Sequence, residues 1–264
     1  MSRKPPGWIF LGLLLWAVAP GLPAQQPASS APLSPKQMQE ERAKIQMAEK
    51  RYDAAIQTYQ DLLKADPKNA VFLNMTGIAY LDLSNYGQAK KYFARSAKAD
   101  KKYSSALNNL GMVYYHQKNF RAAIREYQRA VAIDPDSAAA HSNLGFAYYN
   151  SNKYPEAAVE FQKAVELDPA IFERNDRVGS VVQDRSVNNH GLFFFTMARV
   201  YAQKGDAPRC AEYLRKSLDE GYKDVGKAAT DPAFKSVIND PAVQEVMARA
   251  VPPEQKGSAT HPGA

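Results

Sequence analysis

The chain has 264 residues, of which 45% are hydrophobic and 23% charged, an ordinary composition for a soluble globular protein. The formal net charge of +7 is mild, and basic side chains alternate with acidic ones, as in Glu40, Glu41 and Arg42. This pattern offers no continuous basic stripe to a phosphate backbone, so we expect no nucleic-acid partner. The single cysteine, Cys210, excludes an internal disulfide, and the fold must therefore be held together by packing.

Residues 1–24 have the pattern of a secretory signal peptide. Arg3 and Lys4 precede an apolar run from Trp8 to Ala19, which is shorter than the roughly 20 residues that span a bilayer. We therefore expect cleavage after Ala24, export to the periplasm or beyond, and no integral membrane span afterwards. Retention of the leader as an anchor is the alternative. Residues 25–35 are predicted to form a disordered linker.

Residues 36–169 contain a repeat with a period of 34 residues. Glycine recurs at this interval at Gly77, Gly111 and Gly145. Periods of this length indicate stacked supersecondary units. Three further columns share the interval: tyrosine at Tyr80, Tyr114 and Tyr148; alanine at Ala55, Ala89, Ala123 and Ala157; and aromatic residues at Tyr59, Phe93, Tyr127 and Phe161.

These columns resemble the tetratricopeptide repeat family, in which Leu-Gly and Tyr lie on a first helix and Ala, an aromatic residue and Ala on a second. The resemblance implies an all-α fold, a right-handed superhelical stack (α-solenoid) of about five helix hairpins. Repeats 1 to 4 would start at Lys36, Ala70, Ser104 and Ala138. Small residues such as Gly111 would let the two helices of a hairpin approach closely.

A fifth repeat, residues 191–221, is predicted after an insertion at residues 170–190. It places Cys210 in the small-residue column that holds alanine elsewhere. The insertion is either a ligand-facing flap or a disordered loop. Asp231-Pro232 and Asp240-Pro241 signal short helices, so residues 222–251 are predicted to be C-terminal capping helices. Residues 252–264 are predicted to be a disordered tail.

The sequence contains no catalytic or metal-binding pattern, such as a nucleophile elbow, a phosphate-binding loop or a His-Glu-x-x-His helix. The four histidines lie far apart along the chain, and we interpret His116 and His141 as polar surface residues. We therefore predict that the protein is not an enzyme and uses no cofactor or metal.

The family resemblance places the first helix of each hairpin along a concave groove. Asn109 and Asn143 occupy the sixth position of their repeats, as does the asparagine ladder of superhelical family members that contacts peptide backbone. Met75 and Thr196 interrupt this ladder on either side. Alternatively, the asparagines only keep the groove soluble. The predicted peptide-binding residues of the concave face are Asn74, Ile78, Asn108, Asn109, Met112, Tyr115, Asn143, Phe146, Tyr149 and Arg199.

The predicted function is protein or peptide binding, as an adaptor or scaffold that holds an extended peptide in the groove. One alternative is a structural component of an envelope or secretion assembly, acting through the convex surface or by self-association. A further alternative is an enzyme accessory subunit. The sequence predicts neither the identity of the partner nor the oligomeric state.

Overall fold

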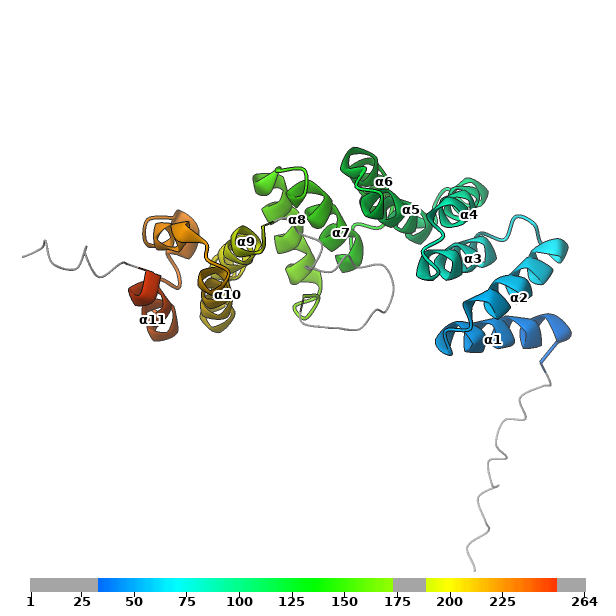
Figure 1. Ribbon diagram of the computed structural model, residues 1–264, viewed down its shortest axis with the longest axis horizontal. Helices are drawn as coiled ribbons and strands as arrows, with labels where there is room; N and C mark the ends of the chain where they lie inside the picture. The colour runs from blue at the N-terminus through cyan, green and yellow to red at the C-terminus, as the bar shows by residue number, and fades with distance from the viewer. Residues whose placement is uncertain (1–32, 173–188, 251–264) are drawn as a thin grey trace, which may run out of the picture.

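The computed structural model describes residues 33–172 and 189–250. It shows a row of helical hairpins with α1 at one end and α11 at the other (Figure 1), and these two ranges contain no strand. The predicted all-α solenoid is confirmed. The helices of the row are α1 (Pro35–Ala48), α2 (Tyr52–Ala65), α3 (Ala70–Asp82), α4 (Tyr86–Ala99), α5 (Ser104–His116), α6 (Phe120–Ile133), α7 (Ala138–Tyr149), α8 (Tyr154–Leu167), α9 (His190–Gln203), α10 (Ala207–Asp219) and α11 (Pro241–Ala250).

Several predicted segments lie outside the described residues. These are the signal peptide (1–24), residues 25–32 of the linker, residues 173–188 of the insertion, and the tail (252–264). The first helix begins at Pro35, one residue before the expected start of repeat 1. Ser34 caps this helix, because its hydroxyl accepts a hydrogen bond from the backbone N–H of Gln37 at 3.3 Å.

Each hairpin packs its two helices against each other, and its second helix packs on the first helix of the next hairpin. Thus α1 and α2 form the first hairpin, and α2 lies against α3. The same order continues to α9 and α10. The first helices of successive central hairpins, α3, α5 and α7, also contact one another and form one side of the stack.

The glycine column has the same environment in three successive hairpins. A Cβ atom on Gly77 would lie 2.6 Å from the Phe93 ring, and one on Gly111 would lie 2.6 Å from the Tyr127 ring. A Cβ on Gly145 would likewise lie 2.6 Å from a ring, that of Phe161. Glycine is therefore required for close approach at this position, where the second helix presses an aromatic ring onto the first.

The turns inside the hairpins also repeat. The residue that reverses the chain has a positive φ of 57° to 59° at Lys50, Ser84, Lys118 and Asn152. The equivalent residue of the fifth hairpin is Gly205, with a φ of 76°. This recurrence shows that the hairpin geometry, and not the residue type, determines the left-handed conformation.

The C-terminal end is closed by α11 and by two short 3-10 helices, η2 (Lys223–Ala229) and η3 (Pro232–Phe234). Asp231 and Asp240 cap η3 and α11, since each carboxylate accepts a hydrogen bond of 2.9 Å from the backbone N–H two residues later. Phe234 and Val243 are fully buried against the fifth hairpin. The pattern of the sequence did not indicate η2.

Candidate peptide-binding groove

Hydrogen-bonded asparagine pairs join the first helices of neighbouring repeats. The Nδ2 atom of Asn109 on α5 donates to Oδ1 of Asn74 on α3 at 2.9 Å. The Nδ2 atom of Asn143 on α7 donates to Oδ1 of Asn108 on α5, also at 2.9 Å. In each pair a fifth-position residue of one repeat meets a sixth-position residue of the next, 35 residues further along the chain. We call these four residues the asparagine ladder.

The asparagine ladder is buried, with exposed fractions between 0% at Asn143 and 5% at Asn108. A role limited to keeping the groove soluble does not fit this burial. A buried amide is costly unless it is hydrogen-bonded, so the pairs hold α3, α5 and α7 in a fixed mutual register.

The ladder ends at the fourth repeat because the fifth-position residue there is the shorter Ser142. Its hydroxyl is buried and makes no hydrogen bond with the described residues. Thr196, the sixth-position residue of the fifth repeat, donates instead to the carbonyl of Leu192 at 2.9 Å. The predicted interruption at Thr196 therefore has a structural basis.

Tyr115, seven residues after Asn108 on α5, is also buried, at 4% exposure. Its hydroxyl accepts a hydrogen bond from Nδ2 of Asn150, at the end of α7. The same Nδ2 atom donates to the carbonyl of Phe146 at 3.2 Å. These bonds form a second polar link between α5 and the end of α7, again with a separation of 35 residues.

Phe146 and Tyr149 face the fifth hairpin. The Phe146 ring is 1% exposed and stacks on Phe193 of α9 with centroids 5.5 Å apart. The Tyr149 hydroxyl donates to the carbonyl of Asn189 at 2.8 Å, and burial raises the pKa of Tyr149. The structure thus places these two predicted binding residues in the core between repeats 4 and 5.

Three predicted residues are partly exposed. Ile78 on α3 and Met112 on α5 each pack one side on the core. The guanidinium of Arg199 on α9 lies 2.8 Å from the carboxylate of Asp231. That ion pair joins α9 to the C-terminal cap, so Arg199 lies at the far end of the row from Ile78.

His141 is buried at 7% exposure, and the prediction that it is a surface residue is wrong. Its Nδ1 atom lies 2.6 Å from Oε2 of Glu160 on α8, and Nε2 lies 3.0 Å from the carbonyl of Pro135. His116, by contrast, is exposed and stacks on Tyr86 with centroids 5.6 Å apart. His141 therefore ties the two helices of the fourth hairpin together.

Comparison with family models identifies three matching segments. A model described as TPR repeat matches residues 111–152, and two models described as tetratricopeptide repeat match residues 138–171 and 46–113. The chain is a tetratricopeptide repeat protein. The matched segments cover α2 to α8, and α3, α5 and α7 carry the asparagine ladder. A comparison with curated proteins finds no match.

Solved structures of other tetratricopeptide repeat proteins share the fold. MamA 41-end from Desulfovibrio magneticus RS-1 has a TM-score of 0.51 at 19% identity, covering 70% of this chain and 94% of that chain. Pseudomonas aeruginosa pilF has a TM-score of 0.52 at 14% identity, covering 81% and 88%. A further MamA crystal structure has a TM-score of 0.50 at 22% identity, covering 72% and 93%. At these identities the likeness concerns the fold alone.

Within residues 33–172 and 189–250, no three His, Cys, Asp or Glu side chains are grouped as metal ligands would be. The helices of the same ranges are all too short or too polar to cross a bilayer. Cys210 is fully buried, and burial raises the pKa of its thiol to about 12. Its place in the alanine column of the repeats explains the burial.

Proposed function

We propose that this tetratricopeptide repeat protein is a protein-interaction module that binds an extended peptide along α3, α5 and α7. The observation that carries the proposal is the orientation of Asn108. Its Oδ1 accepts from Asn143, and its Nδ2 makes no hydrogen bond with any other residue that the structure describes. An asparagine held in this way presents a fixed donor to an incoming carbonyl group.

Contact with a peptide backbone through amides does not depend on the peptide's sequence. Ile78 and Met112, which are partly exposed on the neighbouring turns of α3 and α5, add apolar contacts. Met suits a variable partner because its side chain is flexible and polarizable. Ordering a flexible peptide offsets much of the contact energy, so we expect affinity on the order of micromolar.

The test is binding of a peptide selected from a random library, compared between the wild type and Asn109→Ala/Asn143→Ala. The double variant removes the two donors that orient Asn74 and Asn108. At about 1 kcal/mol for each amide that is no longer held in place, binding should weaken by about 30-fold. The matched control is Gln46→Ala on α1, which removes one buried hydrogen bond, the 2.8 Å bond from the Thr58 hydroxyl, away from the groove. This control should bind as the wild type does.

Unchanged binding by the double variant would refute the proposal that the peptide binds along α3, α5 and α7. It would favour a scaffold that acts through the convex surface. Thermal unfolding of each variant separates loss of a contact from loss of the fold. Peptide binding by Asn108→Ala is the third measurement. This variant removes the donor on which the proposal rests, so it should also bind more weakly than the wild type.

Export of the chain with removal of residues 1–24 is part of the proposal. It is supported by the basic residues Arg3 and Lys4 before the apolar run that ends at Ala19. Mass spectrometry of the chain recovered outside the cytoplasm should find an N-terminus at Gln25. An intact N-terminus there would show that the leader is retained.

A further inference from the structure

The two ends of the helical row differ in how far their apolar side chains are covered. The C-terminal end is covered by η2, η3 and α11, and no large hydrophobic side chain after Val159 is exposed among the described residues. At the N-terminal end, α1 exposes Met38 at 52% and Ile45 at 55%, with Leu33 just before the helix at 51%. Every later hairpin has this side of its first helix covered by the preceding hairpin.

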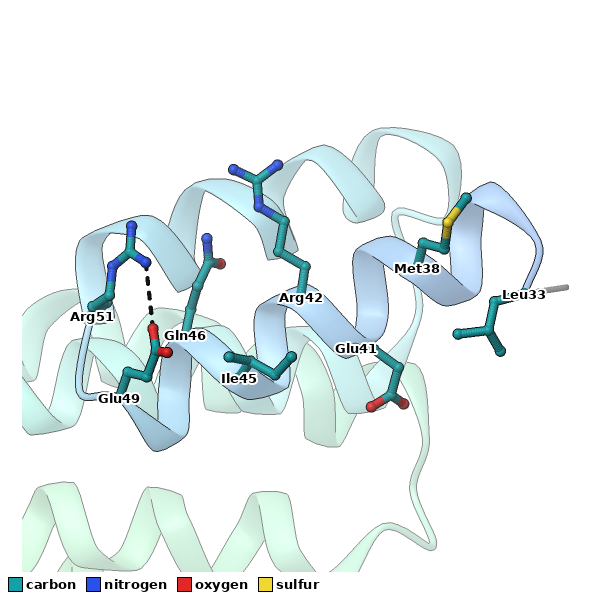
Figure 2. Close-up of a pocket in the computed structure, with 8 residues that line it drawn as sticks. All are labelled: Leu33, Met38, Glu41, Arg42, Ile45, Gln46, Glu49 and Arg51. Atoms are coloured by element: carbon teal, nitrogen blue, oxygen red, sulfur yellow. Dashed lines mark hydrogen bonds and ion pairs between the residues drawn. The ribbon is translucent and has the colours of Figure 1, made fainter.

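The exposed side of α1, here called the α1 face, contains a hollow of about 360 Å³. Figure 2 shows Met38, Glu41, Arg42 and Ile45 following one another along the helix. Charged side chains line the hollow together with the apolar ones. Glu41 bonds to exposed Lys44 at 2.7 Å, whereas Arg42 has no ion-pair partner in the part of the chain that the structure describes. The α1 face is therefore an apolar stripe with an uncompensated cation at its centre.

We propose that the α1 face binds the α1 face of a second copy of this chain, with the two helices antiparallel about a two-fold axis between Glu41 and Arg42. In this register Met38 of one copy meets Ile45 of the other. Glu41 of each copy also meets Arg42 of the other, and each Arg42 gains a carboxylate. The stripe is thus complementary to itself both in apolar contacts and in charge.

The capping of the C-terminal end supports a second copy of the chain, bound face to face, as the partner of the α1 face. A head-to-tail contact would need a matching apolar surface at the other end of the row, and up to Ala250 the C-terminal cap exposes no large hydrophobic side chain. A contact between two identical surfaces closes at two copies, whereas a head-to-tail contact would continue into a filament. The resulting dimer would place two grooves in one particle and double the valency for a repeated peptide.

The experiment measures the mass of the full chain by sedimentation equilibrium in a mild detergent. We expect a monomer–dimer equilibrium for the wild type. Glu41→Arg and Arg42→Glu should each weaken the dimer by about 100-fold, because each change creates two like-charge contacts across the axis. Combining both substitutions restores the opposite charges and should restore the dimer.

Matched apolar variants test the same surface. Met38→Glu should abolish the dimer, whereas Val159→Glu, at a residue that is 65% exposed on α8, should leave it unchanged. Both sites are exposed, so both variants should keep the wild-type circular dichroism spectrum. A cysteine pair in Met38→Cys/Ile45→Cys should crosslink the copies under mild oxidation, while either single cysteine should not.

A monomeric wild type at the highest soluble concentration would overturn the proposal. A dimer that survives Met38→Glu, or a charge-swapped double variant that stays monomeric, would also overturn it. A dimer that dissociates when residues 1–24 are removed would assign the contact to the leader instead of the α1 face. The native Cys210 does not interfere with crosslinking, because it is fully buried.

Discussion

Replacing Gly111 by alanine tests whether close approach of the helices holds each hairpin together. The new Cβ would lie 2.6 Å from Cε1 and 2.7 Å from Cδ1 of Tyr127. The Tyr127 ring is 0% exposed, so it has no solvent-filled space into which it can move. The helices must separate or the ring must leave its rotamer.

Overpacking of this kind costs about 1 to 3 kcal/mol. Alanine favours a helix interior over glycine by about 1 kcal/mol, which opposes that cost. Two ring atoms conflict with the new methyl group, so we place the free-energy cost of overpacking near the upper limit of this range. The expected net loss is about 2 kcal/mol in the free energy of unfolding.

The assay is urea unfolding followed by far-UV circular dichroism. Gly87→Ala on α4 is the matched control, since its Cβ would meet only Oδ1 of Asn85, at 3.9 Å. This control should be neutral or stabilising by up to about 1 kcal/mol. In Gly111→Ala, adding Tyr127→Leu should cost less than it does in the wild type, because the smaller side chain relieves the conflict. Equal stability of Gly111→Ala and Gly87→Ala would refute the reasoning.

Two further predictions concern buried polar atoms. Tyr127→Phe should raise the free energy of unfolding by about 1 kcal/mol in the same urea assay, because the buried Tyr127 hydroxyl has no hydrogen-bond partner within the described residues. Lower stability would reveal a partner for this hydroxyl. Cys210 should react with a thiol reagent at pH 8 at least about 100-fold more slowly in the folded chain than in urea, because burial raises its pKa to about 12 and the thiolate is the nucleophile. Equal rates would show that the fifth hairpin opens readily.

Much of the fold could be predicted from side-chain size and spacing. The glycine and aromatic columns are 34 residues apart because each hairpin makes the same contact, and Gly77, Gly111 and Gly145 indeed meet equivalent rings. Asp-Pro pairs follow the second helix of three hairpins, at Asp66-Pro67, Asp134-Pro135 and Asp168-Pro169. Asp100 ends α4 in an extended conformation even though Lys101 replaces proline. A contact inside a hairpin can be predicted from the sequence when the same residue types recur at its positions in every repeat.

The candidate site was less predictable, because it depends on which helix covers which side chain. The positions of Asn109 and Asn143 indicated a groove, but a repeat period cannot show that their amides bond to Asn74 and Asn108 of the preceding repeat. By their positions within the 34-residue repeat, Phe146 and Tyr149 would face the groove. They are buried because α9 packs directly against the fourth hairpin, which the long gap in the sequence concealed.

The offset pairing of the ladder also bears on how such a chain can change its length. Asn74 and Asn108 are equivalent, as are Asn109 and Asn143, so excising residues 104–137 would bring Asn143 opposite Asn74 with an identical amide contact. Duplicating the same segment would add one more contact of the same kind. Gain or loss of this unit in the gene therefore preserves the amide pairing of the ladder, and the binding surface can lengthen or shorten by one whole repeat at a time.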